Sequence, residues 1–293
     1  MPTRARATSL AELSEIQARM IKPEEVKQGL NLQLRFDDIV ITPFGKSGTT
    51  WIQQIVHTLR TRGDMDFDDI SRVVPWIETS PALGIDLDAE QITNPRAFKS
   101  HLEYEAIPKG GKYINVVRDP KDALYSAYKF FEGWFFEPGT IGLEDFARER
   151  FIKSGAYWRH LKSWWQRRHQ TTVLFLAYEL MKLDLDVTIR RVAEFIDIPL
   201  DEELLELTLL HASLPFMLQH KDRFDDAMLR SLTEDRCNLP FNSDTTKVRQ
   251  GEIGSHTEAF SPELIAGLDE VWRTQITEPL GYPDYESLIK ALD

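Results

Sequence analysis

The chain has 293 residues, of which 42% are hydrophobic and 28% are charged, a composition typical of a globular protein with one large α/β domain or two small ones. Its single cysteine, Cys237, excludes an intrachain disulfide and a cysteine-based zinc cluster, and it favours a reducing, cytoplasmic location. The formal net charge of −12 disfavours nonspecific binding to nucleic acid or anionic membranes, and no apolar stretch reaches the roughly 20 residues that span a bilayer.

Strand-like and helix-like segments alternate along most of the chain. Residues 1–30 are predicted to form a helical or loose N-terminal arm, and residues 31–293 the main domain. We expect strands at 38–42, 96–99, 113–117 and 172–177, and helices at 49–62, 120–131, 143–153, 156–168, 187–196, 202–210 and 261–274. Strands separated by helices predict a central parallel sheet with helices on both faces. Ligands of such sheets bind beyond the carboxyl ends of the strands, so functional residues are expected just after each predicted strand.

The residues after the first predicted strand have the composition of a phosphate-binding loop. A turn between a strand and a helix gathers backbone N–H groups, and the helix N-terminus adds positive potential. Lys46 supplies a charge, and Thr49 and Thr50 supply hydroxyl donors. The spacing is not that of a Walker loop, because the position five residues before Gly45 is Val40, inside the strand. The alternative interpretation is a strand–helix turn that binds no ligand.

The stretch Pro43-Phe-Gly-Lys-Ser-Gly-Thr-Thr-Trp51 resembles the 5′-phosphosulfate loop of the cytosolic-type sulfotransferases. Members of that family use 3′-phosphoadenosine 5′-phosphosulfate (PAPS) as the donor and release adenosine 3′,5′-bisphosphate (PAP). The resemblance implies a single three-layer α/β domain over residues 31–293, with a P-loop-like phosphate loop, similar to the fold of nucleoside kinases. It further implies that the cofactor is bound by Lys46, Ser47, Gly48, Thr49, Thr50 and Trp51.

A second phosphate motif consists of Arg118, at the end of a predicted strand, and Ser126, two helical turns further along. An arginine fork suits phosphate geometry, and the serine offers a hydroxyl on the same side. The family has an arginine and a serine at the same spacing, so the resemblance implies that this pair binds the 3′-phosphate. The alternative is an ion pair of Arg118 with Asp119 that closes the strand–helix turn.

Two further segments resemble the family more loosely. Residues 248–255 resemble the segment that closes over the 3′-phosphate, which implies cofactor contacts for Arg249, Gln250 and Gly251. Gln250 stands where the family usually has a lysine, so one charge is lost there. Tyr178 follows the strand at 172–177 and is implied to contact the adenine. The alternatives are a glycine-containing surface loop and a structural tyrosine.

His101 is the candidate general base, because it follows the strand at 96–99 and histidine titrates near neutral pH. Lys99 lies two residues away and points to the same side of an extended chain, where it offsets charge on the transferred group. The element Lys-Ser-His resembles the family's catalytic element. The resemblance implies in-line attack of the acceptor hydroxyl on sulfur, with His101 accepting the proton and Lys46 and Lys99 offsetting charge. The other six histidines are expected to be structural.

An aromatic cluster is expected to line an apolar acceptor pocket. Its members are Trp76, Phe130, Phe131 and Trp134. The alternative is that these residues only pack in the core. We expect a small lipophilic hydroxyl acceptor, a phenol or an alcohol, and no metal, since a sulfuryl group carries less negative charge than a phosphoryl group. The sequence therefore predicts a PAPS-dependent sulfotransferase; the alternatives are a nucleotide-dependent small-molecule kinase and a non-catalytic nucleotide-binding protein.

Overall fold

Four short hydrophobic segments pair as a parallel sheet in the order β2-β1-β3-β4. In this computed structural model, which describes residues 4–249 and 251–292, the strands are β1 (Ile39–Ile41), β2 (Ala97–Lys99), β3 (Lys112–Val117) and β4 (Val173–Ala177). Each predicted strand is present within one residue at either end. The α/β class with a central parallel sheet is thereby confirmed.

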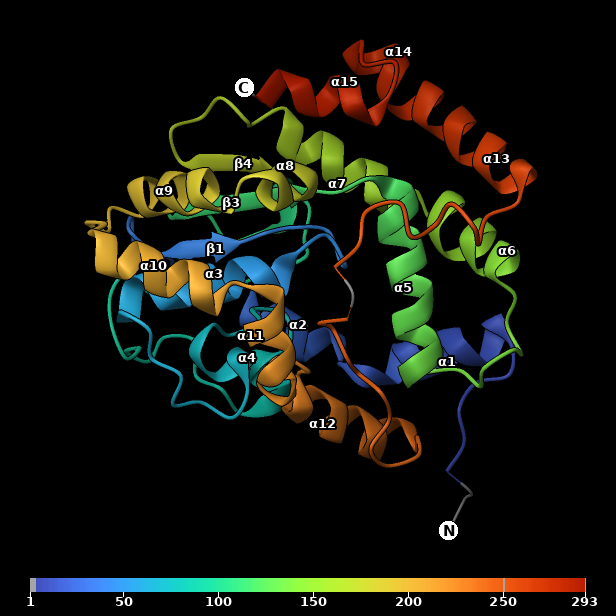
Figure 1. Cartoon of the computed structure of the whole chain (residues 1–293). Coiled ribbons are helices and arrows are strands. Elements are labelled where there is room, and N and C mark those ends of the chain that lie inside the picture. The colour runs from blue at the N-terminus through green and yellow to red at the C-terminus, as the bar shows by residue number, and fades with distance from the viewer. Residues whose placement is uncertain (1–3, 250, 293) are drawn as a thin grey trace.

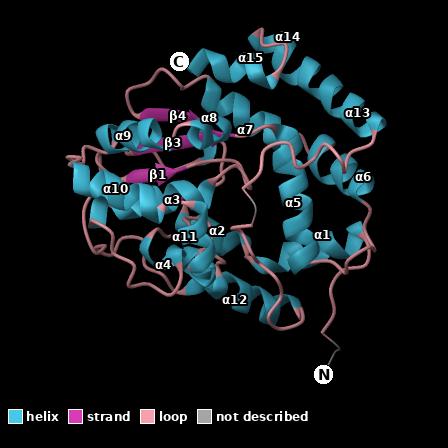
Figure 2. Ribbon diagram, viewed as in Figure 1, coloured by secondary structure: helices cyan, strands magenta, loops and turns pink. Residues whose placement is uncertain are grey.

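Helices cover both faces of this sheet (Figures 1 and 2). They are α1 (Leu10–Met20), α2 (Pro23–Gly29), α3 (Thr49–Thr61), α4 (Ile70–Val73), α5 (Pro120–Trp134), α6 (Leu143–Phe146), α7 (Ala156–Trp165), α8 (Tyr178–Leu183), α9 (Leu185–Phe195), α10 (Glu202–His211), α11 (Leu214–Gln219), α12 (Ala227–Cys237), α13 (Pro262–Trp272), α14 (Glu278–Leu280) and α15 (Tyr285–Ile289). Two π-helical turns, Ala147–Ile152 and Arg273–Thr277, follow α6 and α13. No helix among the described residues is long and apolar enough to cross a membrane.

Alternating side chains of the strands supply two separate cores. Ile39 and Ile41 of β1 pack on one face with Ile52 of α3, among other residues. Val40 points the opposite way and packs with Phe98 in a larger cluster that includes tryptophans of α7. This is the period of two expected of a strand buried on both faces, and it explains why β1 and β4 are apolar throughout.

Several predicted helices differ from the observed ones at their ends or in their winding, and α5 ends three residues later and α7 three residues earlier than predicted. The segment 143–153 starts as α6 and then widens into the π-helical turn Ala147–Ile152, and α13 ends in another such turn. An apolar pattern predicts a helix in both cases, because it does not distinguish the two windings. Helix α9 begins earlier than predicted because the Asp184 side chain accepts from the Val187 N–H, 3.0 Å away, and caps it.

The N-terminal residues are helical and packed against the body of the protein. Leu13 and Ile16 of α1 are buried, and Glu25 of α2 pairs with Arg236 of α12 at 2.6 Å. The boundary near residue 30 remains a prediction, since packing alone does not show that either part folds separately.

Candidate active site

The sheet reverses its order at β1 and β3, which lie side by side although β2 intervenes in the sequence. Ligands of open parallel sheets bind at such a switch point, beyond the carboxyl ends of the strands. The loop after β1 carries Lys46, and the residue directly after β3 is Arg118. The fold thus places both predicted phosphate-binding motifs at one crevice.

The loop between β1 and α3 turns on two residues in the left-handed region, Lys46 with a φ of 70° and Gly48 with a φ of 94°. Gly48 directly precedes α3, so the free N–H groups of the first helical turn face the loop. A Cβ at position 48 would lie 2.9 Å from a ring carbon of Tyr178. The site therefore requires glycine for its backbone conformation and for its contact with the tyrosine.

We expect Gly48→Ala to weaken PAP binding by roughly tenfold or more, since left-handed strain and displacement of Tyr178 each cost on the order of 1–3 kcal/mol. Isothermal titration calorimetry with PAP measures this. Gly84→Ala is the matched control, because Gly84 also has a positive φ, 70°, but a Cβ there meets nothing within 4 Å. Equal PAP affinity for Gly48→Ala and the wild type would contradict the assignment.

Two buried donors beside the loop have no hydrogen-bond partner among the described residues. They are the Thr49 hydroxyl and Nε of Arg118, and both residues line the same cavity. Buried polar groups are rarely left without a partner, so each marks a place for an acceptor atom of a ligand. Phosphate oxygens are such acceptors, and the residues present fit a phosphorylated cofactor. A third donor, the Ser47 hydroxyl in the loop itself, is likewise buried without a partner among the described residues, but Ser47 does not line this cavity.

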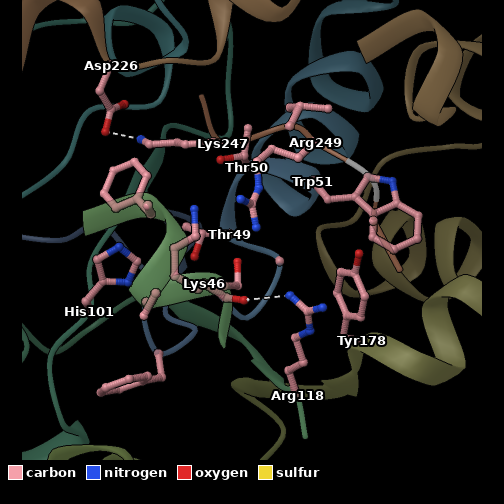
Figure 3. A pocket seen from close by; sticks show the side chains of 18 of the residues that line it. Lys46, Thr49, Thr50, Trp51, His101, Arg118, Tyr178, Asp226, Lys247 and Arg249 are labelled. Carbon is pink, nitrogen blue, oxygen red and sulfur yellow. Dashed lines mark hydrogen bonds and ion pairs between the residues drawn. The ribbon is translucent and has the colours of Figure 1, made fainter. Parts of the chain in front are cut away.

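Arg118 connects three parts of the site (Figure 3). Its Nη1 donates to the carbonyl of Lys46 at 3.2 Å, its Nη2 donates to the carbonyl of Glu252 at 2.9 Å, and its guanidinium lies 4.4 Å from the ring centre of Tyr178. Ser126, on α5, lines the cavity with it. The alternative interpretation, an ion pair of Arg118 with Asp119, is not found among the described residues, and Asp119 instead caps α5 through the Lys121 N–H.

Two aromatic rings stand together near Arg118 and form a surface suited to a planar base. Trp51 and Tyr178 meet edge to face with ring centres 5.5 Å apart, and the indole N–H of Trp51 donates to the carbonyl of Ala212 at 2.8 Å. Figure 3 shows both rings on the Arg118 side of Lys46, with His101 on the other side. Aromatic rings of this kind stack on a purine at low cost in side-chain entropy.

The segment that carries Arg249 is held against the helices around the cavity. Asp122 of α5 accepts from the Gly254 N–H at 2.8 Å and contacts Nδ1 of His256 at 2.7 Å. The Lys182 ammonium donates to the carbonyl of Gly251 at 2.6 Å. Arg249 and Gly251 line the cavity, whereas Gln250 lies outside the described residues. His256 was expected to be structural, and its contact with Asp122 anchors this segment.

His101 is fixed in one tautomer. Its Nδ1 lies 2.7 Å from the carbonyl oxygen of Pro43, which only accepts, so Nδ1 carries the proton and Nε2 is left as a base. Its backbone N–H donates to Glu78, and its ring packs edge-on against Trp76. Burial lowers the pKa of His101 to about 4; the Pro43 contact opposes this, and the charge of Lys99 adds to it. The imidazole is therefore neutral at pH 7.

We expect the ring of His101 to titrate near pH 4 in the free protein, well below the ordinary 6.5 of a histidine. A proton-detected NMR titration measures the pKa, with His101→Gln identifying the resonance that disappears. A titration midpoint near 6.5 would contradict the buried, neutral state described above.

Lys99 belongs to a buried charge network that its sequence context did not indicate. Its ammonium lies 3.1 Å from Asp226 Oδ1, and the same carboxylate pairs with Lys247 and accepts from the Ser71 hydroxyl at 2.8 Å. Burial alone would raise the pKa of Asp226, but Lys247 and Lys99 lower it below its usual range. Burial lowers the pKa of Lys99 to about 8 against the opposing effect of Asp226.

Lys46 stands at the centre of a group of cations. Burial lowers its pKa well below the ordinary value, and the charges of Lys247, Arg249 and Arg118 add to this effect. Its ammonium also lies 4.1 Å from the ring centre of Phe130. Several cations around one cavity repel one another, which costs free energy unless an anion lies between them. A doubly phosphorylated nucleotide would provide such anions. Lys247 is the functional candidate that the sequence missed, although it lies two residues before Arg249.

One cavity of about 670 Å³ collects these groups. The predicted residues that line it are Lys46, Gly48, Thr49, Thr50, Trp51, Trp76, Lys99, His101, Arg118, Ser126, Phe130, Phe131, Trp134, Tyr178, Arg249 and Gly251. Of the predicted residues that the structure describes, only Ser47 does not line it. The aromatic residues therefore face the same space as the cationic groups, with His101 among them.

Comparison with known proteins agrees with this geometry. A family model described as "Sulfotransferase domain" matches residues 36–279. The chain belongs to the cytosolic-type sulfotransferase family. It is 27% identical to sulfotransferase 1C2 of Rattus norvegicus over 290 residues, covering 94% of this chain and 95% of that one. It is 30% identical to sulfotransferase 1B1 of Mus musculus over 256 residues, covering 82% of this chain and 83% of that one.

Solved structures of related fold include a retinol dehydratase in complex with retinol and PAP, with a TM-score of 0.70 at 19% identity over 95% of this chain and 98% of that chain. The mouse sulfotransferase SULT7A1 complexed with PAP gives a TM-score of 0.69 at 22% identity over 93% of this chain and 94% of that chain. These likenesses confirm the sulfotransferase fold predicted from the loop after β1.

Proposed function

We propose that this sulfotransferase transfers the sulfuryl group of PAPS to a hydroxyl of a small lipophilic acceptor. The observation that carries the proposal is the convergence of the β1–α3 loop, Arg118 with Ser126, and His101 on one cavity. The presence of PAP in related structures supports the choice of donor.

In this proposal the chain holds the cofactor in three places. The N–H groups at the start of α3, together with Lys46, Thr49 and Thr50, bind the 5′-phosphosulfate. Arg118 and Ser126 bind the 3′-phosphate, with the Arg249 segment, including Gln250 and Gly251, closing over it. Trp51 and Tyr178 hold the adenine. Apart from Gln250, which lies outside the described residues, each of these roles belongs to a residue that lines the cavity.

When bound, PAPS supplies an activated sulfuryl group. His101 Nε2 accepts the proton of the acceptor hydroxyl, and the hydrogen bond from Nδ1 to Pro43 keeps that nitrogen unprotonated beforehand. Lys46, Lys99 and Lys247 offset the negative charge on the transferred and leaving oxygens. The aromatic residues Trp76 and Phe130 exclude water beside the acceptor, which strengthens these charge interactions.

An acceptor screen with PAPS labelled in the sulfuryl group tests the proposal, with a parallel arm of γ-labelled ATP and Mg²⁺. We expect label transfer from PAPS to phenols or lipophilic alcohols, and none from ATP. Transfer from ATP alone would establish the kinase alternative. PAP binding without transfer to any acceptor would favour the non-catalytic binding protein.

A further inference from the structure

Arg150 is a cation in the aromatic half of the cavity, away from the groups assigned to the cofactor. It lies in the π-helical turn Ala147–Ile152 and lines the cavity together with Phe146 and Phe151. The wider winding of a π-helix brings positions 146, 150 and 151 towards one face. Such turns often occur at functional sites.

No carboxylate compensates the charge of Arg150 within the described residues. The one hydrogen bond of its side chain within the described residues is from Nη1 to the Ser14 hydroxyl of α1, at 3.2 Å, and the side chain makes neither an ion pair nor a cation–π contact there. The side chain is half-buried, and burial lowers its pKa. An arginine in such a position favours an anionic partner, and a carboxylate binds its planar fork through two hydrogen bonds.

Arg150 sits apart from the cationic group around Lys46. The charges that most lower the pKa of Lys46 are those of Lys247, Arg249 and Arg118. The contact with Ser14 instead places Arg150 beside α1, which also supplies Gln17 to the cavity wall. An anion at Arg150 would therefore be a different group from the phosphates of the cofactor.

A second donor in the same half of the cavity lacks a partner. Trp134 lines the cavity and is 3% exposed, and its indole N–H is buried with no acceptor among the described residues. The buried side-chain oxygen of Gln17 is also unpaired in this part of the structure; it is an acceptor, so it suits a donor group of a ligand and not a carboxylate. The aromatic half thus contains polar groups that a purely apolar acceptor would leave unsatisfied.

We propose that the acceptor carries a carboxylate on an aromatic or otherwise apolar body, and that Arg150 binds this carboxylate while the hydroxyl reaches His101. The inference rests on the proposed function and specifies its substrate class. Hydroxyaryl carboxylic acids, such as hydroxyphenylalkanoates, have this chemistry. Arg150 is then a specificity-determining residue, and it takes no part in the chemical step.

A matched pair of acceptors tests the inference: 3-(4-hydroxyphenyl)propanoate and its methyl ester, assayed with saturating PAPS. We expect the wild type to show at least a tenfold higher kcat/KM for the acid, through a lower KM. Arg150→Met should lose roughly tenfold or more of kcat/KM for the acid and change little for the ester, the range for a charged hydrogen bond. Arg150→Lys should retain part of the preference.

Arg148→Met is the matched control, because Arg148 is in the same helical turn but is exposed and does not line the cavity. It should behave as the wild type. PAP affinity and thermal unfolding identify any variant that is misfolded. If Arg150→Met is misfolded, calorimetry decides whether the wild type, with PAP bound, binds the acid more tightly than the ester. Equal use of acid and ester by the wild type, or an unchanged preference in a folded Arg150→Met, would overturn the inference.

The failure of this inference is distinct from the failure of the proposed function. Sulfation of the ester or another neutral phenol without a preference for the acid would contradict only the role of Arg150. If no acceptor in the screen receives the sulfuryl group from PAPS, the proposed function is contradicted. Tighter binding of the acid than of the ester to the PAP complex would then still support an anion site at Arg150.

Discussion

Replacement of His101 by alanine is expected to lower kcat by about 100- to 10,000-fold, the range for loss of a positioned general base. PAP affinity should stay within about twofold of the wild type, because the hydrogen bond of His101 to the loop goes to the carbonyl of Pro43 and not to a donor assigned to the cofactor. Steady-state transfer from labelled PAPS and calorimetry with PAP measure the two quantities. The pattern of intact binding with lost turnover separates an enzyme from a nucleotide-binding protein.

His169→Ala is the control for this experiment, since His169 is exposed and lies outside the cavity. It should keep full activity. A His101→Ala variant that retains more than about a tenth of the wild-type kcat would show that another group removes the proton. A large loss of PAP affinity would instead assign His101 to cofactor binding.

Replacement of Asp226 by asparagine is expected to lower the free energy of unfolding by about 3–5 kcal/mol, because it leaves buried Lys99 and half-buried Lys247 without their counter-charge. Asparagine keeps the size of the side chain and tolerates the left-handed backbone at this position, where φ is 48°. Denaturant unfolding at pH 7 measures the change. The difference in stability between the wild type and Asp226→Asn therefore reports the loss of the carboxylate charge.

The control is Asp235→Asn in α12, the helix that follows Asp226; it removes a partly exposed ion pair with Arg4 and should cost less than about 1 kcal/mol. The folded-state pKa of Asp226 is depressed, so its charge stabilises the protein above the ordinary carboxyl pKa of 3.8. The stability difference between the wild type and Asp226→Asn should shrink as the pH falls below that value. Equal stabilities of the wild type and Asp226→Asn at pH 7 would contradict a stabilising role of the charge network.

Much of the sheet and of the cofactor site could be predicted because the signals are local. A strand, a glycine turn and a helix start occupy consecutive positions around Lys46, and the pairing of β1 with β3 brings Arg118 to the same crevice. His101 is recognisable because Lys99 and a strand end accompany it. In each case, the residues that identify the motif are neighbours in the chain.

The charge network was not predictable in this way. Asp226 lies 127 positions from Lys99, in a segment without a motif, and only packing of the α12 start against β2 joins them. Lys247 gave no signal beyond its place near Arg249. The pairing of Asp226 with Lys99 and Lys247 follows only from the tertiary structure, which brings this carboxylate to both lysines.

The N-terminal residues were predicted as an arm on the basis of their polarity. In the structure, α1 packs through Leu13 and Ile16, and Gln17 and Met20 line the cavity. Helical amphipathicity over eleven residues is a weak signal, and contact with a distant cavity is not encoded in local sequence. Gln17 and Met20 therefore form part of the cavity wall in the proposed site.

A crystal structure of the protein with PAP tests the convergence of these groups most directly. The account predicts the 5′-phosphate at the start of α3 beside Lys46, the 3′-phosphate on Arg118 and Ser126, and His101 Nε2 facing the 5′-phosphate across the acceptor space. PAP bound elsewhere, or a 5′-phosphate on the side of the cavity away from His101, would contradict it.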